Sequence, residues 1–307
     1  MNLRSLRSDG ILLLTAMIWG TAFAAQRAGM EYIGPFFYTG IRFALGTLVL
    51  FPFWPRRRRY TASLSLSDRS RREVEAQARA RTIRAGAVAG VVLTLGILFQ
   101  QVGIVYTTAG KAGFITGMYV VIVPIIAICI GRKTYLGGWI GAFLAIGGLY
   151  FLSMTENFTM SRGDVLIVVC AVFWAIHVLV LAKYAPDVPF ISLAVIQYAI
   201  CAVLSLTIAV FAEPISISAL TSASAPILYG GVVSVGIAYT LQIVGQRDAP
   251  PTHAAIILSL EGVFAAVGGF LILGEHLSLR EVAGCALLLI GMIVSQLTRP
   301  RNSQNRA

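Results

Sequence analysis

Charged residues are scarce in this 307-residue chain, at 12% of the sequence. Soluble domains typically carry about 25%. Apolar residues reach 57%, and the mean hydropathy is +0.81. The low charge content excludes an ordinary soluble domain, and apolar stretches of spanning length recur along the chain. The sequence therefore indicates an all-α integral membrane protein.

Cysteine is also rare. The four cysteines each lie within an apolar run and form no Cys-x-x-Cys pair. This distribution argues against a disulfide framework and against a zinc site. We expect no metal site and interpret the cysteines as small packing residues: Cys129, Cys170, Cys201 and Cys285.

Motifs of pumps and enzymes are missing as well. No G-x-x-x-x-G-K-[ST] loop occurs, which argues against ATP-driven pumping by this chain. His177, His253 and His276 lie on different segments, and the sequence has neither H-E-x-x-H nor a paired-carboxylate motif. An integral-membrane enzyme acting on lipid-like substrates would need such a cluster. We therefore expect no catalytic residues and no cofactor.

Ten apolar segments are long enough to cross a bilayer, which takes roughly 20 helical residues. The first lacks an evident cleavage motif, so we predict a membrane helix and not a removable signal peptide. Most connections are short, and the long one covers 56–83. The predicted spans are 10–28, 34–54, 85–107, 111–130, 135–154, 164–184, 189–212, 224–245, 252–273 and 279–298.

The basic residues between the spans predict the orientation. With the N-terminus inside, 19 of the 24 Lys and Arg residues fall on the inner side. The outer side keeps four, and Arg42 lies within a span; the four are Arg27, Lys111, Arg162 and Arg280. Cytoplasmic loops are enriched in Lys and Arg. We predict a multi-pass protein of the cell inner (plasma) membrane with both termini in the cytoplasm.

The connection 56–83 is strongly basic and contributes to a net charge of +11. Its Arg56 to Arg59 run and the helix-permissive segment 69–84 could bind anionic lipid headgroups or nucleic acid. We interpret the connection as a topology anchor with a solvated loop, and we expect no nucleic-acid partner.

The chain repeats itself. DGILLLTAMIWG from Asp9 matches DVLIVVCAVFWA from Asp164 at an offset of 155, which pairs Trp19 with Trp174. At an offset of 143, three glycines of the first half match three of the second: Gly131, Gly141 and Gly148 with Gly274, Gly284 and Gly291. Five helices per half place the second half in the opposite orientation. We predict two inverted five-helix repeats, 1–155 and 156–307, an architecture common among secondary transporters.

Longer motifs occur in both halves of the chain. They are MIWGTAFAAQRAG (Met17 to Gly29), GIRFALGTLVL (Gly40 to Leu50), QQVGIVYTTAGKAGFITGMYVVIVPIIA (Gln100 to Ala127) and SLEGVFAAVGGFLILGEHLSLREVAGCALLLIGMIV (Ser259 to Val294). With these motifs the sequence resembles the drug/metabolite transporter superfamily, specifically its EamA-type members with ten helices. One departure is Gly262, where that family often has Pro, and it predicts a weaker or differently placed bend in the ninth helix.

The resemblance implies a carrier of small metabolites, amino acids or drugs, with a central cavity lined by helices 1, 3, 4, 6, 8 and 9. Aromatic-lined cavities occur in amino-acid exporters of that family. Polar residues within spans tend to face such an interior. Our substrate-pathway candidates are Trp19, Gln101, Tyr119, Trp174, His177, Tyr239, Gln242 and Glu261. For each one alone, interhelical hydrogen bonding or packing is the competing interpretation.

Two charges lie inside predicted spans. Glu261 is central in 253–274, where a carboxylate is costly enough to mark a functional site; a structural hydrogen-bonded Glu is the alternative. Arg42 could pair with Glu261, bind a substrate carboxylate or extend to the interface. We favour a gating or structural role for Arg42. His177 or Glu261 could couple transport to protons.

These observations predict a secondary transporter. We expect it to move amino acids or related neutral or zwitterionic compounds, drugs among them, by alternating access and in the direction of export. The expected partners are the small-molecule substrate and the lipid bilayer, and the sequence leaves a homodimer open. The alternatives are the integral-membrane enzyme on lipid-like substrates and a membrane scaffold without transport.

Overall fold

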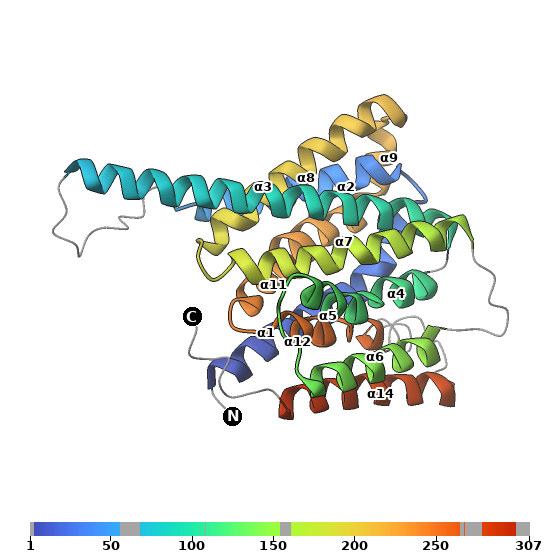
Figure 1. Ribbon diagram of the computed structural model, residues 1–307. Helices are drawn as coiled ribbons and strands as arrows, with labels where there is room; N and C mark the ends of the chain where they lie inside the picture. The colour runs from blue at the N-terminus through green and yellow to red at the C-terminus, as the bar shows by residue number, and fades with distance from the viewer. Residues whose placement is uncertain are drawn as a thin grey trace.

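The computed structural model describes residues 3–55, 68–107, 109–153, 161–264, 267 and 278–298. Within these ranges the chain is a bundle of helices without strands (Figure 1). The elements are α1 (Leu3–Gly29), α2 (Pro35–Leu50), the short 3₁₀ turn η1 (Phe51–Phe53), α3 (Asp68–Tyr106), α4 (Ala109–Gly117), α5 (Tyr119–Cys129), α6 (Leu136–Ser153), α7 (Arg162–Tyr184), α8 (Phe190–Ala212), α9 (Ile217–Ser222), α10 (Ser224–Leu228), the π-helix η2 (Tyr229–Tyr239), α11 (Thr240–Gln246), α12 (Pro251–Leu258) and α14 (Leu279–Leu297).

Six of the described helices are long and apolar enough to cross a membrane. They correspond to the first, second, third, sixth, seventh and eighth predicted spans. Four shorter apolar helices, Ile115–Cys129, Leu136–Phe151, Pro251–Phe264 and Val282–Leu297, fall on the remaining predicted spans. The all-α membrane fold is confirmed, while the count of ten full-length spans is not reproduced exactly.

Interruptions explain the shorter helices. The fourth predicted span divides at Met118 into α4 and α5, and Pro124 within α5 cannot donate a backbone hydrogen bond. The ninth turns at Ser259 and Leu260, and helical backbone resumes at Glu261. The sequence predicted an altered bend from Gly262, and the structure places the turn just before the acidic residue. Residues 268–277 of that predicted span lie outside the described residues.

The basic connection is helical from Asp68 onward. It belongs to α3, whose first turns project beyond the bundle (Figure 1). The prediction of a solvated loop over all of 56–83 was therefore wrong for residues 68–83, because the helix-permissive segment continues into the third span without a break. The run Arg56 to Arg59 lies outside the described residues. Arg81 forms an ion pair with Asp187, which follows α7.

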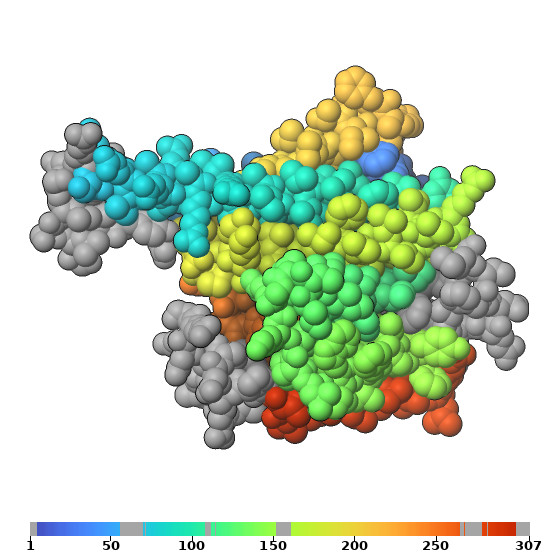
Figure 2. Space-filling view, viewed as in Figure 1, coloured from blue at the N-terminus to red at the C-terminus, as the bar shows by residue number. Residues whose placement is uncertain are grey.

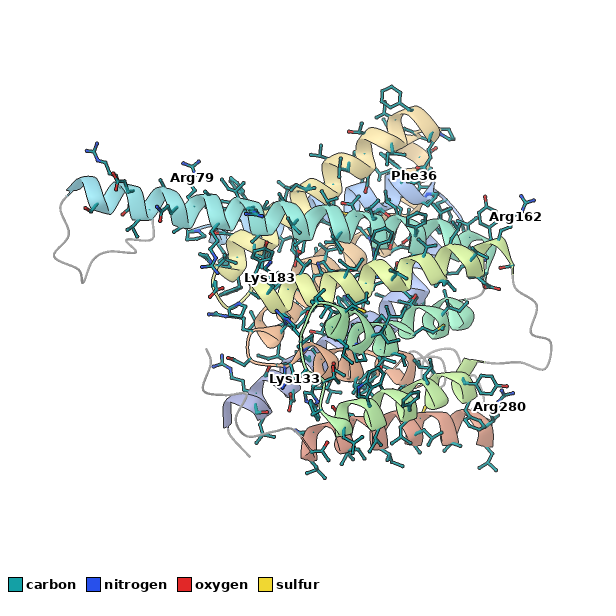
Figure 3. The ribbon with its side chains drawn as sticks, in the orientation of Figure 1. Phe36, Arg79, Lys133, Arg162, Lys183 and Arg280 are labelled. Atoms are coloured by element: carbon teal, nitrogen blue, oxygen red, sulfur yellow. The ribbon has the colours of Figure 1, made fainter. Side chains whose placement is uncertain are left out.

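Basic side chains gather at the two ends of the helices. In Figure 3, Arg79, Lys133 and Lys183 lie toward the end of the bundle where α1 begins, and Arg162 and Arg280 lie toward the opposite end. We call these the α1-start end and the opposite end. Large apolar side chains such as Leu48, Val203 and Phe143 are exposed between the two ends. An apolar belt of this kind is what a lipid environment requires.

The strongest packing joins helices from different halves of the sequence. In Figures 1 and 2, α6 lies beside α14, α3 beside α7 and α8, and α2 also packs on α8. Glycines permit the closest approach between α6 and α14. A Cβ atom at Gly141 would lie 2.7 Å from the carbonyl oxygen of Gly291, and one at Gly148 would lie 2.6 Å from that of Gly284. The two backbones are therefore in contact at both crossings.

We expect Gly141→Ala to destabilise the protein by about 1–3 kcal/mol, because its methyl group would collide with backbone that cannot move aside. The measurement is the thermal unfolding midpoint of the purified protein in detergent, which should fall. Gly147→Ala is the matched control, since a Cβ atom at Gly147 meets nothing within 4 Å on the same helix. Equal midpoints for the two variants would contradict the close helix contact.

Candidate functional site

Three aromatic side chains from three helices meet in the centre of the bundle. Trp19 of α1, Trp174 of α7 and Tyr239 at the end of η2 are all buried. The Trp19 and Trp174 rings are 5.8 Å apart between centroids, and Tyr239 lies 4.6 Å from Trp19 and 5.8 Å from Trp174. These separations are typical of interacting aromatic pairs. The two tryptophans that match in the sequence repeat therefore lie on one aromatic wall.

This wall borders a central cavity with an empty volume of about 420 Å³. Most of this space lies too close to side chains for a water molecule to enter, and the rest is too small for a metabolite. The cavity is thus narrow in this conformation. Its lining consists of Trp19, Phe23, Gln26, Gln100, Thr116, Tyr119, Trp174, Val178, Ser234, Tyr239, Gln242, Leu258 and Glu261.

The structure gathers six of the eight candidate residues around this cavity: Trp19, Tyr119, Trp174, Tyr239, Gln242 and Glu261. Gln101 and His177 are buried outside the lining. In place of Gln101, its neighbour Gln100 faces the cavity, and its amide nitrogen donates to Thr116 Oγ1 at 3.2 Å. The helical spacing of Thr116 and Tyr119 already indicated a shared face, and this contact extends that face to α3.

Polar lining residues that the sequence analysis had not selected are Gln26, Gln100, Thr116 and Ser234. Gln26 could have been found from its spacing, because it lies seven residues after Trp19 and so shares its helix face. Ser234 could not be found in this way. It lies within the π-helix η2, where the ordinary helical period does not apply.

Glu261 is the acidic member of the lining, and it is 5% exposed. It follows the turn at Ser259 and Leu260, which aims the start of the next helical segment at the cavity. Among the described residues no ion pair or hydrogen bond reaches its carboxylate. A buried carboxylate without a partner is costly, so its position favours a role in binding a cation or a proton over a structural role.

Several other polar atoms around the cavity also lack hydrogen-bond partners within the described part of the chain. They are Nε1 of Trp19 and of Trp174, the hydroxyl of Tyr119, Oε1 of Gln26, and both amide atoms of Gln242. Most buried polar groups in proteins are hydrogen-bonded. This concentration of unused donors and acceptors in one small volume is what a site prepared for a polar ligand would contain.

Arg42 lies behind the aromatic wall and outside the cavity lining. It is 1% exposed, and its guanidinium carbon lies 5.4 Å from the ring centroid of Tyr38 and 5.2 Å from that of Phe43. Phe43 in turn packs 5.6 Å from Tyr239. Nε and Nη2 of Arg42 have no partner among the described residues. The pairing of Arg42 with Glu261 that the sequence allowed does not occur in this conformation.

His177 supports the wall from the other side. Its ring packs edge-on against Trp174 at 5.7 Å, and Nε2 lies 3.2 Å from Oε1 of Gln197. Nδ1 is buried and without a partner within the described residues. His177 therefore contacts the back of a cavity residue and not the cavity itself.

Comparisons with known proteins agree with this arrangement. The model of the EamA-like transporter family matches residues 6–154 and 161–296. An uncharacterized transporter of Archaeoglobus fulgidus is 30% identical over 96% of this chain and 88% of its own length. The uncharacterized transporter YoaV of Bacillus subtilis is 20% identical over 95% of this chain and 97% of its own length.

A solved structure, titled only as the crystal structure of a protein, shares the fold. Its TM-score is 0.73 at 18% sequence identity, and the likeness covers 94% of this chain and 96% of the other. The family match extends over nearly all of the bundle and includes each element that lines the cavity. This chain is therefore a multi-pass membrane protein that belongs to the EamA-like transporter family of the drug/metabolite transporter superfamily.

Proposed function

We propose that this protein is a secondary transporter that exports amino acids or related neutral or zwitterionic metabolites, drugs among them, by alternating access. The observation that carries the proposal is the central cavity, which combines an aromatic wall, amide and indole groups and one carboxylate, the last three without partners among the described residues. We retain all eight predicted residues as the proposed substrate pathway. Gln101 and His177 do not line the cavity, so they would act on the substrate only through neighbouring residues.

The chemistry of the lining favours a substrate with an amino group. Aromatic faces attract cations, and the carboxylate of Glu261 can accept hydrogen bonds from an ammonium group. The amide of Gln242 and the indole N–H groups can bind neutral or carboxylate oxygen atoms. A strongly anionic solute would be repelled by Glu261, so an amino acid or a neutral amphiphile fits the site better than a phosphorylated metabolite.

The narrowness of the cavity supports alternating access. A metabolite can enter only if the cavity widens, and a carrier of this kind opens its two ends in turn. The reciprocal contacts of α6 with α14 support the inverted repeat, because Gly141 meets the equivalent of Gly148 while Gly148 meets the equivalent of Gly141. A pseudo-two-fold axis between the halves 1–155 and 156–307 would produce this exchange.

The distribution of basic residues supports an inner (plasma) membrane location with both termini in the cytoplasm. Lys133, Lys183 and Arg79 lie at the α1-start end, which the sequence assigned to the cytoplasm (Figure 3). Export is proposed because aromatic-lined cavities occur in amino-acid exporters of the resembled family. The transport experiments below separate this function from an enzyme on lipid-like substrates and from a scaffold without transport.

We expect Glu261→Gln to reduce the flux of labelled amino acids into proteoliposomes by about 10- to 100-fold, because hydrogen bonds to charged groups contribute about 1.5–3 kcal/mol. Flux should be measured with and without a pH gradient, and the gradient should no longer stimulate the variant. Glu261→Asp is the matched control that keeps the charge. If parent and Glu261→Gln transport equally and independently of pH, Glu261 neither binds substrate nor couples protons.

We expect Trp174→Ala to raise the KM for transport by about three- to tenfold, the equivalent of losing one aromatic contact of about 0.5–1.5 kcal/mol. Trp174→Phe should restore part of the affinity. Trp139→Ala is the control, because Trp139 packs on Phe143 of α6 and is absent from the cavity lining. The same change in KM for the Trp139 variant would argue against the aromatic wall as the binding surface.

A further inference from the structure

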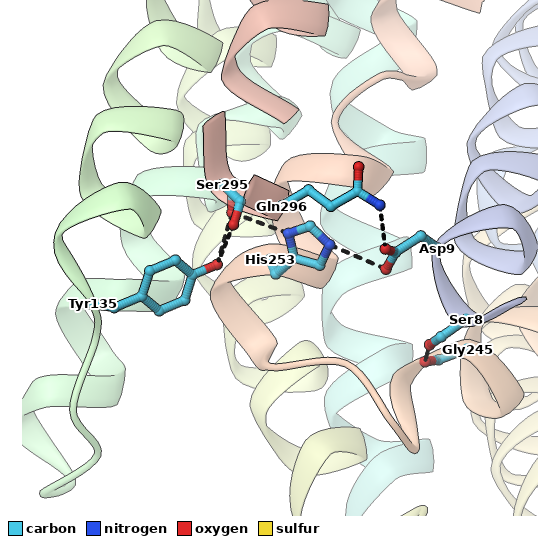
Figure 4. Close-up of polar contacts among 7 residues, drawn as sticks. All are labelled: Ser8, Asp9, Tyr135, Gly245, His253, Ser295 and Gln296. Atoms are coloured by element: carbon cyan, nitrogen blue, oxygen red, sulfur yellow. Dashed lines mark hydrogen bonds and ion pairs between the residues drawn. The ribbon is translucent and has the colours of Figure 1, made fainter. Parts of the chain in front are cut away.

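A second polar cluster lies near the start of α1, and none of its residues lines the cavity (Figure 4). His253 of α12 is fully buried, and its Nε2 lies 3.0 Å from Oδ1 of Asp9 in α1. Its Nδ1 lies 3.0 Å from Oγ of Ser295 in α14. Gln296 donates from Nε2 to the other oxygen of Asp9 at 2.9 Å, and the hydroxyl of Tyr135 lies 2.9 Å from Ser295 Oγ. We call these five residues the Asp9–His253 cluster.

The cluster joins segments from both halves of the chain. Asp9 and Tyr135 belong to the first half, on α1 and just before α6, whereas His253 and Ser295 belong to the second, on α12 and α14. Beside the cluster, Ser8 donates from its hydroxyl to the carbonyl oxygen of Gly245 at the end of α11. For the cavity to open toward this end, α1 would have to separate from α12 or α14. The Asp9–His253 contact would then have to break.

The charged groups around His253 identify Asp9 as its electrostatic partner. Asp9 is 9% exposed and contacts the imidazole directly. Next to His253, α14 contributes the uncharged Ser295. The segment before α6 contributes the phenol of Tyr135, which contacts Ser295. No charged residue occurs within α5, α6 or α11. The remaining described charges near this end, on the elements packed on α12 and on the segment before α6, are the half-buried Arg132 and five residues exposed to solvent: Arg7, Lys133, Lys183, Arg247 and Asp248.

The geometry accommodates two protonation states of His253. In the neutral imidazole, Nε2–H donates to Asp9 and the hydroxyl of Ser295 donates to Nδ1. When His253 gains a proton, Nδ1–H donates to Ser295 Oγ, and the serine hydroxyl rotates toward the oxygen of Tyr135. Tyr135 keeps a separate acceptor, the carbonyl oxygen of Ser295 at 2.9 Å. A proton can thus be added to the buried ring while every nitrogen of the ring stays hydrogen-bonded.

We propose that the Asp9–His253 cluster is a proton-binding site that controls opening of the α1-start end. Proton uptake converts the hydrogen bond from the neutral imidazole to the carboxylate of Asp9 into an ion pair between the halves, which is stronger, and so favours the closed end. Loss of the proton weakens the contact and favours opening. The inference rests on the proposed transport function, and it adds a proton site at the α1-start end that is separate from Glu261 in the cavity.

The experiment measures opening directly, without a substrate. Spin labels are attached at Arg7→Cys in α1 and Leu297→Cys in α14, in a protein whose four native cysteines are replaced by Ser. Both label sites are exposed. Distances are measured by pulsed electron paramagnetic resonance in proteoliposomes at about pH 5 and about pH 8, on either side of the ordinary titration range of His. In the otherwise unmodified protein, the long-distance population should rise several-fold at the higher pH.

His253→Gln should abolish this pH dependence while keeping an amide that can donate to Asp9, and Asp9→Asn should weaken it. His177→Gln is the matched control, because His177 is the other described buried histidine and lies behind the cavity wall. The proposal is overturned if the parent distances do not change with pH, if the change persists in His253→Gln, or if His177→Gln alone removes it. Absence of amino-acid flux in the transport assay would refute the proposed substrate class and leave this readout unaffected.

Discussion

Burial of polar side chains without water is the constraint on which this structure depends. Each long helix satisfies its own backbone hydrogen bonds, so its side chains decide how it packs in lipid. The apolar ones cover the outside, and the polar ones must find partners within the bundle. Most do so in pairs that hold helices together, such as Tyr198 with Thr240 and Thr107 with Asp164. Among the described residues, six buried polar atoms of the cavity lining have no such partner, and these groups lie where a substrate can reach them.

The two halves of the chain are interwoven and do not form separate bodies. Each principal helix pair takes one member from either half, so the main core cluster runs from Leu12 and Trp19 to Ile257 and Leu258. The proposed alternating access would then require sliding along these shared interfaces. Glycine contacts suit such motion, because they contain few side chains that must change rotamer. The paired glycines of α6 and α14 therefore allow close contact between the halves without interdigitating side chains at these positions.

Much of the fold could be predicted from the sequence because hydropathy reports burial in lipid directly. The helix face that carries Trp19 was recognisable for the same reason. The choice between Gln100 and Gln101 was harder, since successive residues on a helix differ by about 100° in direction and both side chains are buried. The Asp9–His253 contact could not be predicted, because it joins residues 244 positions apart and the repeat that includes Asp9 does not point to His253.

Equivalent positions in the repeat have acquired different chemistry. Asp9 and Asp164 match in sequence, yet Asp164 completes a capping box with Ser161 at the start of α7, whereas Asp9 lies two turns into α1 and meets an imidazole. An internal repeat supplies two copies of a helix end, and each copy can then take its own role. Sequence similarity between the halves identified the positions but could not distinguish these roles.

The π-helix η2 has a consequence for how this protein tolerates change. A π-helical turn contains an additional residue relative to an α-helical one, so it acts as an insertion that the bundle has absorbed. Glycines on both sides of this contact make room for it, with Gly231 of η2 against Leu45 and Gly46 of α2 against Val235. Because the additional residue is absorbed within η2, deletion of one residue there would restore α-helical winding and leave the direction of the following residues unchanged. Gln242 would then stay at the cavity, whereas Ser234 within η2 would turn, so this segment can change its length without moving the cavity residues that follow it.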